Sequence, residues 1–166
     1  MDVLAAQVGA ILKAHGMMLA TAESCTGGGV AQTITEVAGS STWFERGFVT
    51  YSNLSKQQML GVREATLKKH GAVSEMTARE MVAGALQHSA AQVALAVSGI
   101  AGPDGGTADK PVGTVWFAWG TKGGEVYAQR HQLNGNRAKV RAQAVHIALQ
   151  GVLNLLNKLT EIARKL

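Results

Sequence analysis

The stretch Gln92-Val93-Ala94-Leu95-Ala96-Val97 contains five consecutive apolar residues and is short enough to form one β-strand. Strands that are apolar on both faces belong to sheets that helices cover on both sides. A helix is predicted directly before this stretch, over residues 76–90, with Ser74 as its N-cap. A loop rich in glycine follows at residues 99–111. The stretch therefore predicts a buried central strand of an α/β sheet.

Outward from this strand, apolar periodicity predicts strands that alternate with helices. A first helix carries Leu4, Val8 and Leu12 on one face and ends at Gly16. Further strands are predicted at residues 17–22 and 43–51, and helices at 26–37 and 52–61. A late hairpin at 112–120 and 125–133 precedes one long helix, or two in series, over 136–166. This order predicts α/β class, as a single three-layer α/β/α domain with a mixed β-sheet.

The composition narrows the class of protein. The chain has 166 residues, of which 46% are hydrophobic and 16% are charged, so disorder is excluded. The formal charge of +5 is local, because residues 130–166 hold 7 basic residues and one acidic residue. The sequence contains no basic run with interleaved aromatic residues, so nucleic acid is not expected as a partner. No apolar run approaches the ~18 residues of a membrane span. With no basic leader and a single cysteine, the cytoplasm is the expected location.

The first candidate for chemistry is the segment of residues 21–29, between a predicted strand and a predicted helix. Ser24 could be a nucleophile there, with backbone N–H groups beside it to hold an oxyanion. The alternative is that Ser24 or Thr26 only caps the helix. Cys25 is the single thiol of the chain and could be a nucleophile or a small packing residue.

The second candidate is the segment of residues 50–56, at the next strand-to-helix turn. Tyr51 could end the strand in a cleft, and Lys56 would lie about one turn into the helix. Burial that favours the neutral amine would let Lys56 deprotonate a serine. The alternative is a solvated lysine and a tyrosine in the core.

Two further segments could bind a nucleotide. Asp104 lies in the loop of residues 99–106 and could hold a ribose hydroxyl or only stabilise the turn. Arg137 and Arg141 are four residues apart on one helix face, where they could clamp a phosphate or stay solvated. The five histidines are scattered, so a zinc site is not expected.

Taken together, these segments resemble the CinA C-terminal domain family, the nicotinamide-nucleotide amidohydrolases. Four blocks carry the resemblance, in family order: Ala22-Glu23-Ser24-Cys25-Thr26-Gly27-Gly28, Gly47-Phe48-Val49-Thr50-Tyr51-Ser52-Asn53 with Lys56, Gly99-Ile100-Ala101-Gly102-Pro103-Asp104-Gly105-Gly106, and Lys110-Pro111-Val112-Gly113-Thr114-Val115. The likeness covers nearly the whole chain and implies one amidohydrolase domain over residues 1–166.

The resemblance implies deamidation of nicotinamide mononucleotide to nicotinate mononucleotide and ammonia, without a metal or cofactor. It assigns Ser24 as the nucleophile and Lys56 as its base, and Tyr51 would assist proton transfer or orient the lysine. We add that backbone N–H groups near residues 26–28 hold the oxyanion. The residues expected to bind substrate are Thr26, Gly27, Gly28, Asn53, Gly102, Asp104, Arg137 and Arg141.

Three other functions stay open at this point. The chain could be an amidase that uses Cys25, a nucleotide-binding or competence-associated module without activity, or a hydrolase of a different amide. The apolar strand at Trp116 and Trp119 and the long C-terminal helix could also support self-association.

Overall fold

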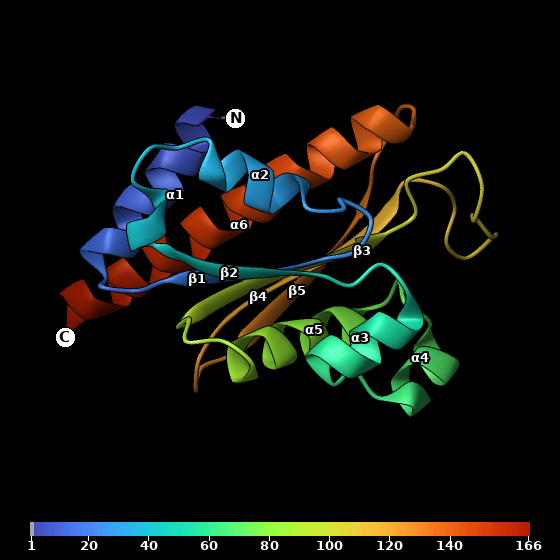
Figure 1. Cartoon of the computed structure of the whole chain (residues 1–166), viewed down its shortest axis with the longest axis horizontal. Helices are drawn as coiled ribbons and strands as arrows, with labels where there is room; N and C mark the ends of the chain where they lie inside the picture. Colours follow the sequence, from blue (N-terminus) through green and yellow to red (C-terminus); the bar gives the residue numbers. More distant parts are fainter. Residues whose placement is uncertain (1) are drawn as a thin grey trace.

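A computed structural model describes residues 2–166 and contains one five-stranded sheet, in the order β2-β1-β3-β4-β5 (Figure 1). Strand β1 pairs in parallel with both β2 and β3, whereas β3-β4 and β4-β5 are antiparallel. The predicted mixed sheet is therefore confirmed. The strands are β1 (Leu19–Glu23), β2 (Phe44–Val49), β3 (Val93–Gly99), β4 (Thr114–Thr121) and β5 (Val126–Gln132).

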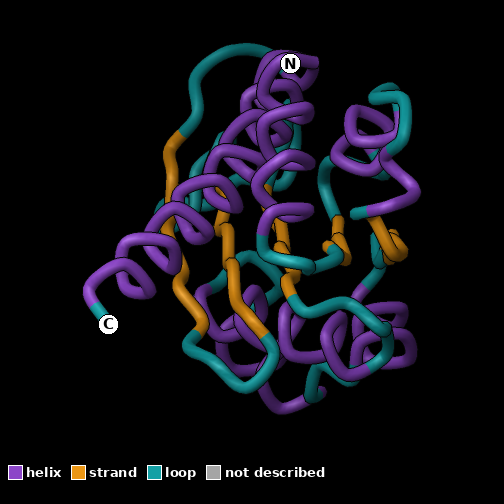
Figure 2. Tube along the Cα trace, turned by 90° about the vertical axis from the view of Figure 1, so that its left-hand side faces the viewer, coloured by secondary structure: helices purple, strands orange, loops and turns teal. Residues whose placement is uncertain are grey.

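Helices cover both faces of this sheet, as the two perpendicular views show (Figures 1 and 2). One layer holds α1 (Asp2–Ala14), α2 (Gly29–Thr35) and α6 (Arg137–Lys165). The other layer holds α3 (Asn53–Leu60), α4 (Glu64–His70) and α5 (Glu75–Gln87). The expected three-layer α/β/α architecture is confirmed, and the last helix is one continuous element.

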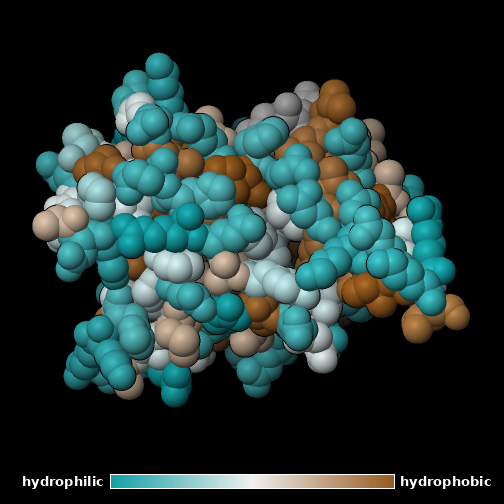
Figure 3. Space-filling model, turned by 180° about the vertical axis from the view of Figure 1, so that it is seen from behind, coloured by the Kyte–Doolittle hydropathy of each residue, from teal (hydrophilic) through white to brown (hydrophobic). Residues whose placement is uncertain are grey.

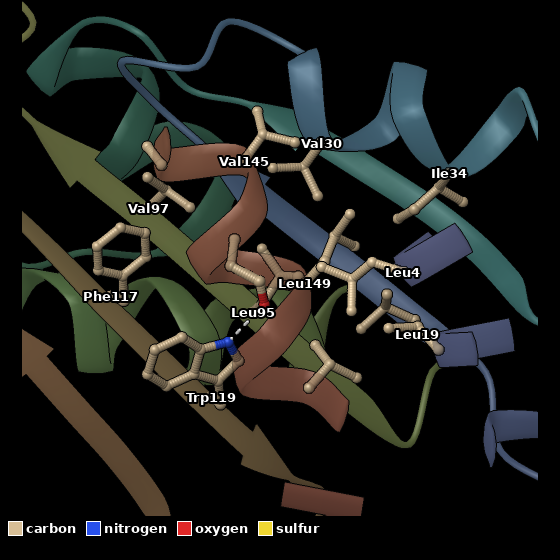
Figure 4. Packing of buried hydrophobic residues seen from close by; sticks show 14 of the residues in the cluster. Leu4, Leu19, Val30, Ile34, Leu95, Val97, Phe117, Trp119, Val145 and Leu149 are labelled. Atoms are coloured by element: carbon tan, nitrogen blue, oxygen red, sulfur yellow. Dashed lines mark hydrogen bonds between the residues drawn. The ribbon is translucent and has the colours of Figure 1, made fainter. Parts of the chain in front are cut away.

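The two faces of the sheet differ in side-chain size. Toward α6 the strands present large residues, among them Leu95, Phe117 and Trp119, which Figure 4 shows packed beside Leu149. The indole Nε1 of Trp119 donates to the carbonyl of Ala148 at 2.8 Å. Toward α5 the fully buried hydrophobic residues of the central strands are all alanines, namely Ala20, Ala22, Ala94, Ala96 and Ala118, and Trp116 packs partly buried beside them. Small side chains let α5 lie close to the sheet, because helix-to-sheet distance follows side-chain volume.

Trp119 is 3% exposed, so its burial under α6 removes it from any surface for self-association. The surface seen in Figure 3 is mostly hydrophilic and carries small, separate hydrophobic patches. No helix among residues 2–166 is long and apolar enough to span a membrane.

Several predicted boundaries need correction. Helix α2 begins at Gly29 and not at residue 26, because Gly27 and Gly28 have left-handed φ values of 58° and 101°. Neither Ser24 nor Thr26 caps α2, since its N-cap is Gly28, which has no side chain. Helix α4 was not predicted from the sequence at all. The predicted cap at Ser74 is confirmed, because its hydroxyl accepts from the N–H of Thr77.

Candidate active site

A pocket of about 170 Å³ opens where three parallel strands end. In α/β sheets the carboxyl ends of parallel strands are the usual place for ligands. Residues following β1, β2 and β3 meet here, and Arg137 approaches from the start of α6. The lining residues are Ser24, Cys25, Tyr51, Asn53, Lys56, Ala72, Val73, Ser98, Gly99, Ala101 and Arg137.

Ser24 and Lys56 form a direct pair in this pocket. The Nζ of Lys56 lies 3.1 Å from the Oγ of Ser24, and it donates to the carbonyls of Thr50 at 3.0 Å and Tyr51 at 3.2 Å. A neutral amine has two N–H groups and one lone pair, which match two carbonyl acceptors and one hydroxyl donor. A charged amine would instead donate to all three oxygens, so the contacts fit Lys56 both before and after it receives the proton of Ser24.

The burial of Lys56 supports the same role. Its side chain is 1% exposed, and it forms none of the salt bridges found in the described residues. Burial disfavours the charged form and lowers the pKa of Lys56 below that of an ordinary lysine. The alternative of a solvated lysine is therefore wrong.

Cys25 is a poor nucleophile in this environment. Its side chain is 6% exposed and belongs to the core that packs against α6. Burial raises the pKa of the Cys25 thiol to about 11. The reactive thiolate is therefore scarce at neutral pH, which favours Ser24.

The turn after Ser24 carries backbone donors. The N–H of Gly27 donates to the carbonyl of Ser24 at 3.0 Å, and that of Gly29 donates to Thr26 at 2.9 Å. Within residues 2–166, no acceptor takes the N–H of Thr26 or of Gly28. Gly27 is thus occupied. The N–H of Cys25 likewise has no acceptor in the described residues, so the candidates for an oxyanion site are the N–H groups of Cys25, Thr26 and Gly28, and of these residues Cys25 lines the pocket.

Tyr51 lies at the mouth of the pocket and not in the core. Its side chain is 63% exposed, and its hydroxyl accepts from the Nη2 of Arg137 at 3.2 Å. It is the Tyr51 carbonyl, not the hydroxyl, that contacts Lys56. Because Lys56 reaches Ser24 directly, a proton relay through the Tyr51 hydroxyl is not needed.

The two arginines predicted to act together have different partners. Arg137 lines the pocket and donates from Nη1 to the carbonyl of Gly102 at 2.8 Å. Arg141 donates from Nε to the carbonyl of Cys25 at 3.1 Å and from Nη2 to that of Thr26 at 3.2 Å. Arg137 therefore faces the ligand space, whereas Arg141 holds the turn after Ser24.

The remaining candidate residues differ in whether they line the pocket. Asn53 lines the pocket, but Asp104 is exposed in the loop beyond it and does not line it. Sequence reasoning missed Ser98, which lines the pocket and donates to the carbonyl of Ala72 at 2.8 Å. Its position at the end of the buried strand is the signal that could have found it. Sequence reasoning also missed Glu23, whose carboxylate is buried beside Ser24.

A second pocket lacks a counterpart of the Ser24 and Lys56 pair. A larger pocket of about 360 Å³ lies between β5 and α6, and no serine, threonine or cysteine is among its lining residues. Among residues 2–166, no three His, Cys, Asp or Glu side chains are grouped to hold a metal ion.

The fold and the pocket define a class: an α/β/α domain with a buried serine–lysine pair, suited to nucleophilic attack on a carbonyl. The chain belongs to the CinA C-terminal domain family, which matches residues 1–156. It is similar to the nicotinamide-nucleotide amidohydrolase PncC of Escherichia coli K12, at 60% identity over 89% of each chain. The protein of that name from Pseudomonas putida is 53% identical over 92% of this chain and 94% of its own.

Solved structures agree with this assignment. The competence/damage inducible protein CihA from Agrobacterium tumefaciens superposes with a TM-score of 0.90 at 46% identity, over 94% of each chain. A CinA superfamily protein from Klebsiella pneumoniae gives a TM-score of 0.91 at 41% identity, over 95% of this chain and 98% of that one.

Proposed function

We propose that this chain hydrolyses the carboxamide of nicotinamide mononucleotide, releasing ammonia and nicotinate mononucleotide. The contact of 3.1 Å between Ser24 Oγ and Lys56 Nζ inside a pocket is the observation that carries the proposal. Relatives of high identity named as nicotinamide-nucleotide amidohydrolases support the substrate. A non-catalytic module would have no need for a buried lysine in contact with a serine hydroxyl.

In the first half of the reaction, neutral Lys56 takes the proton of Ser24 while Oγ attacks the carboxamide carbon. The negative oxygen that forms is held by free N–H groups of the turn after Ser24, which are those of Cys25, Thr26 and Gly28. Lys56 then gives its proton to the departing nitrogen, the C–N bond breaks and ammonia leaves. An ester between Ser24 and the nicotinoyl group remains.

In the second half, a water molecule attacks this ester. Lys56 accepts a proton from the water and returns it to the Oγ of Ser24 as the C–O bond breaks. The products are a carboxylic acid, which ionises, and the restored serine. Lys56 is therefore a base and then an acid in each half.

Substrate binding is assigned to the mouth of the pocket. Arg137 has only neutral acceptors as partners, the carbonyl of Gly102 and the hydroxyl of Tyr51, so its charge is free to pair with a phosphate. Asn53 lines the same mouth. We leave Asp104 out of the binding set because its side chain is exposed in the loop beyond the pocket. We leave Arg141 out because its guanidinium donates to the carbonyls of Cys25 and Thr26.

Two expectations complete the proposal. A phosphorylated substrate does not cross a bilayer unaided, so we place the activity in the cytoplasm. The exposed face of α6 is the surface that a second copy could use.

The proposal is tested by ammonia release from nicotinamide mononucleotide, measured with purified protein in the presence and absence of a chelator. Ser24→Ala should lower kcat by about 10³-fold or more, because it removes the nucleophile. Cys25→Ala is the matched control, one residue away, and should keep most of the activity. Circular dichroism checks that each variant is folded.

The other outcomes point to the competing functions. Loss of activity in Cys25→Ala alone would support the cysteine amidase. Binding of the nucleotide by folded protein without ammonia release would support a binding module. Equal activity on nicotinamide without the ribose phosphate would support a hydrolase of another amide.

A further inference from the structure

The carboxylate of Glu23 is buried directly before the nucleophile. Its side chain is 1% exposed and accepts three hydrogen bonds. Oε1 accepts from the hydroxyl of Thr26 at 2.6 Å and from the N–H of Val30 at 2.8 Å, and Oε2 accepts from the N–H of Ala31 at 3.1 Å. All three neighbours are donors, which is the pattern that a carboxylate acceptor requires.

These contacts close a turn. A buried carboxylate is tolerated only where donors satisfy it. Gly28 offers no side chain to cap α2, so the N–H groups of Val30 and Ala31 in its first turn depend on Glu23. Residues 24–28 must therefore loop out between the end of β1 and the start of α2.

Arg141 holds the same turn from another element. Its guanidinium, on α6, donates to the carbonyls of Cys25 and Thr26, which are adjacent in the chain. Arginine presents its donors in a fixed fork, so two such bonds set the orientation of both peptide groups. Arg141 is in no salt bridge found in the described residues, so these carbonyls are its principal partners.

We propose that Glu23 and Arg141 are positioning residues that together hold the turn of residues 24–28. The pair keeps Ser24 Oγ in reach of Lys56 Nζ and fixes the peptide group between Cys25 and Thr26, which carries the N–H donor of Thr26. This inference rests on the proposed hydrolysis. It predicts that both residues act on the rate of the chemical step and not on substrate affinity.

Glu23→Gln and Arg141→Lys test the inference by kcat and KM for ammonia release. The amide of Glu23→Gln keeps the shape but turns one acceptor into a donor that faces a backbone N–H. Arg141→Lys keeps the charge and loses the fork. We expect each to lower kcat by about 10²-fold, the cost of a small misplacement, with KM nearly unchanged.

Two controls separate positioning from other roles. Ile34→Ala opens the core under α2 without touching the turn, so it should lower Tm while kcat below the transition stays near that of the parent. The kcat of the double variant Glu23→Gln/Arg141→Lys should be only slightly lower than that of the less active single variant. Both substitutions loosen the same turn, so their effects should not multiply.

Equal kcat in Glu23→Gln and the parent would overturn the role of Glu23, and a rise in KM with unchanged kcat in Arg141→Lys would make Arg141 a substrate ligand instead. Fully multiplied losses in the double variant would show that the two residues do not share one turn. Absence of ammonia release from the parent protein would reject the proposed hydrolysis itself. That outcome differs from failure of the positioning role, in which the parent is active and the variants are equally active.

Discussion

Buried polar side chains in this molecule differ in how well they are satisfied. Two of those around the active site are fully satisfied, because Glu23 has three hydrogen-bond partners and Lys56 also has three. Thr21, in the middle of β1, is fully buried and its Oγ1 has no hydrogen-bond partner. An unsatisfied buried hydroxyl costs free energy that an isosteric methyl group does not.

We expect Thr21→Val to raise the free energy of unfolding by about 1 kcal/mol, since it removes that desolvation cost. Urea unfolding measures the change. Thr114→Val is the matched control, because Thr114 is equally buried but its hydroxyl donates to the carbonyl of Pro111 at 2.6 Å. That variant should lose stability. Destabilisation of both variants alike would show that Thr21 is satisfied after all.

At the scale of elements, the position of Lys56 depends on how α3 rests on α5. Gly84, in the middle of α5, lies so close to the carbonyl of Leu60 that an added Cβ would overlap it. Leu60 is the last residue of α3, the helix that carries Lys56. A side chain at position 84 must therefore displace α3.

Gly84→Ala should lower kcat as well as stability, because moving α3 moves Lys56 away from Ser24. We expect a destabilisation of about 1–3 kcal/mol from overpacking. Gly151→Ala is the control: its Cβ would overlap the ring of Trp119 on the opposite face of the sheet, far from the pair. Gly151→Ala should lower the free energy of unfolding about as much as Gly84→Ala does. Its kcat, measured below the unfolding temperature, should be unchanged. A normal kcat in Gly84→Ala would uncouple α3 packing from catalysis.

At the scale of the molecule, the catalytic pair is assembled from both helical layers. Ser24 begins the connection to α2, which lies on the α6 side of the sheet, whereas Lys56 lies on α3, on the α5 side (Figure 1). The two side chains meet over the edge formed by the ends of β1 and β2. Lys56 is thus buried only when all three layers are in place.

This dependence predicts how stability varies with pH. The pKa of Lys56 is lowered in the folded state, so between that pKa and the ordinary lysine value of about 10.4 the unfolded chain binds more protons. The free energy of unfolding should therefore rise with pH across that window, and lose this gain as pH falls below it.

The measurement is urea unfolding at a series of alkaline pH values, for the parent and for Lys56→Met. The difference between the two curves should grow with pH in favour of the parent, because methionine does not titrate. Parallel curves would mean that Lys56 keeps an ordinary pKa in the folded state, and its role as a neutral base would then fail.

Much of the site could be predicted because it lies next to strand ends. Ser24 and Lys56 each follow a predicted strand, and the topology brought those ends together. The shared phosphate clamp of Arg137 and Arg141 could not be judged, since helix spacing places both on one face but does not say what each meets. Glu23 was overlooked because its partners, seven and eight residues later, approach it only after the turn closes.

The sequence by itself determined the layers, the mixed sheet and the family. Apolar periodicity is a local property, and the stretch of residues 92–97 already required helices on both faces. Only the tertiary structure decided which groups are reactive. The pKa values of Lys56 and Cys25 depend on how much water their neighbours exclude, and those neighbours come from distant parts of the chain.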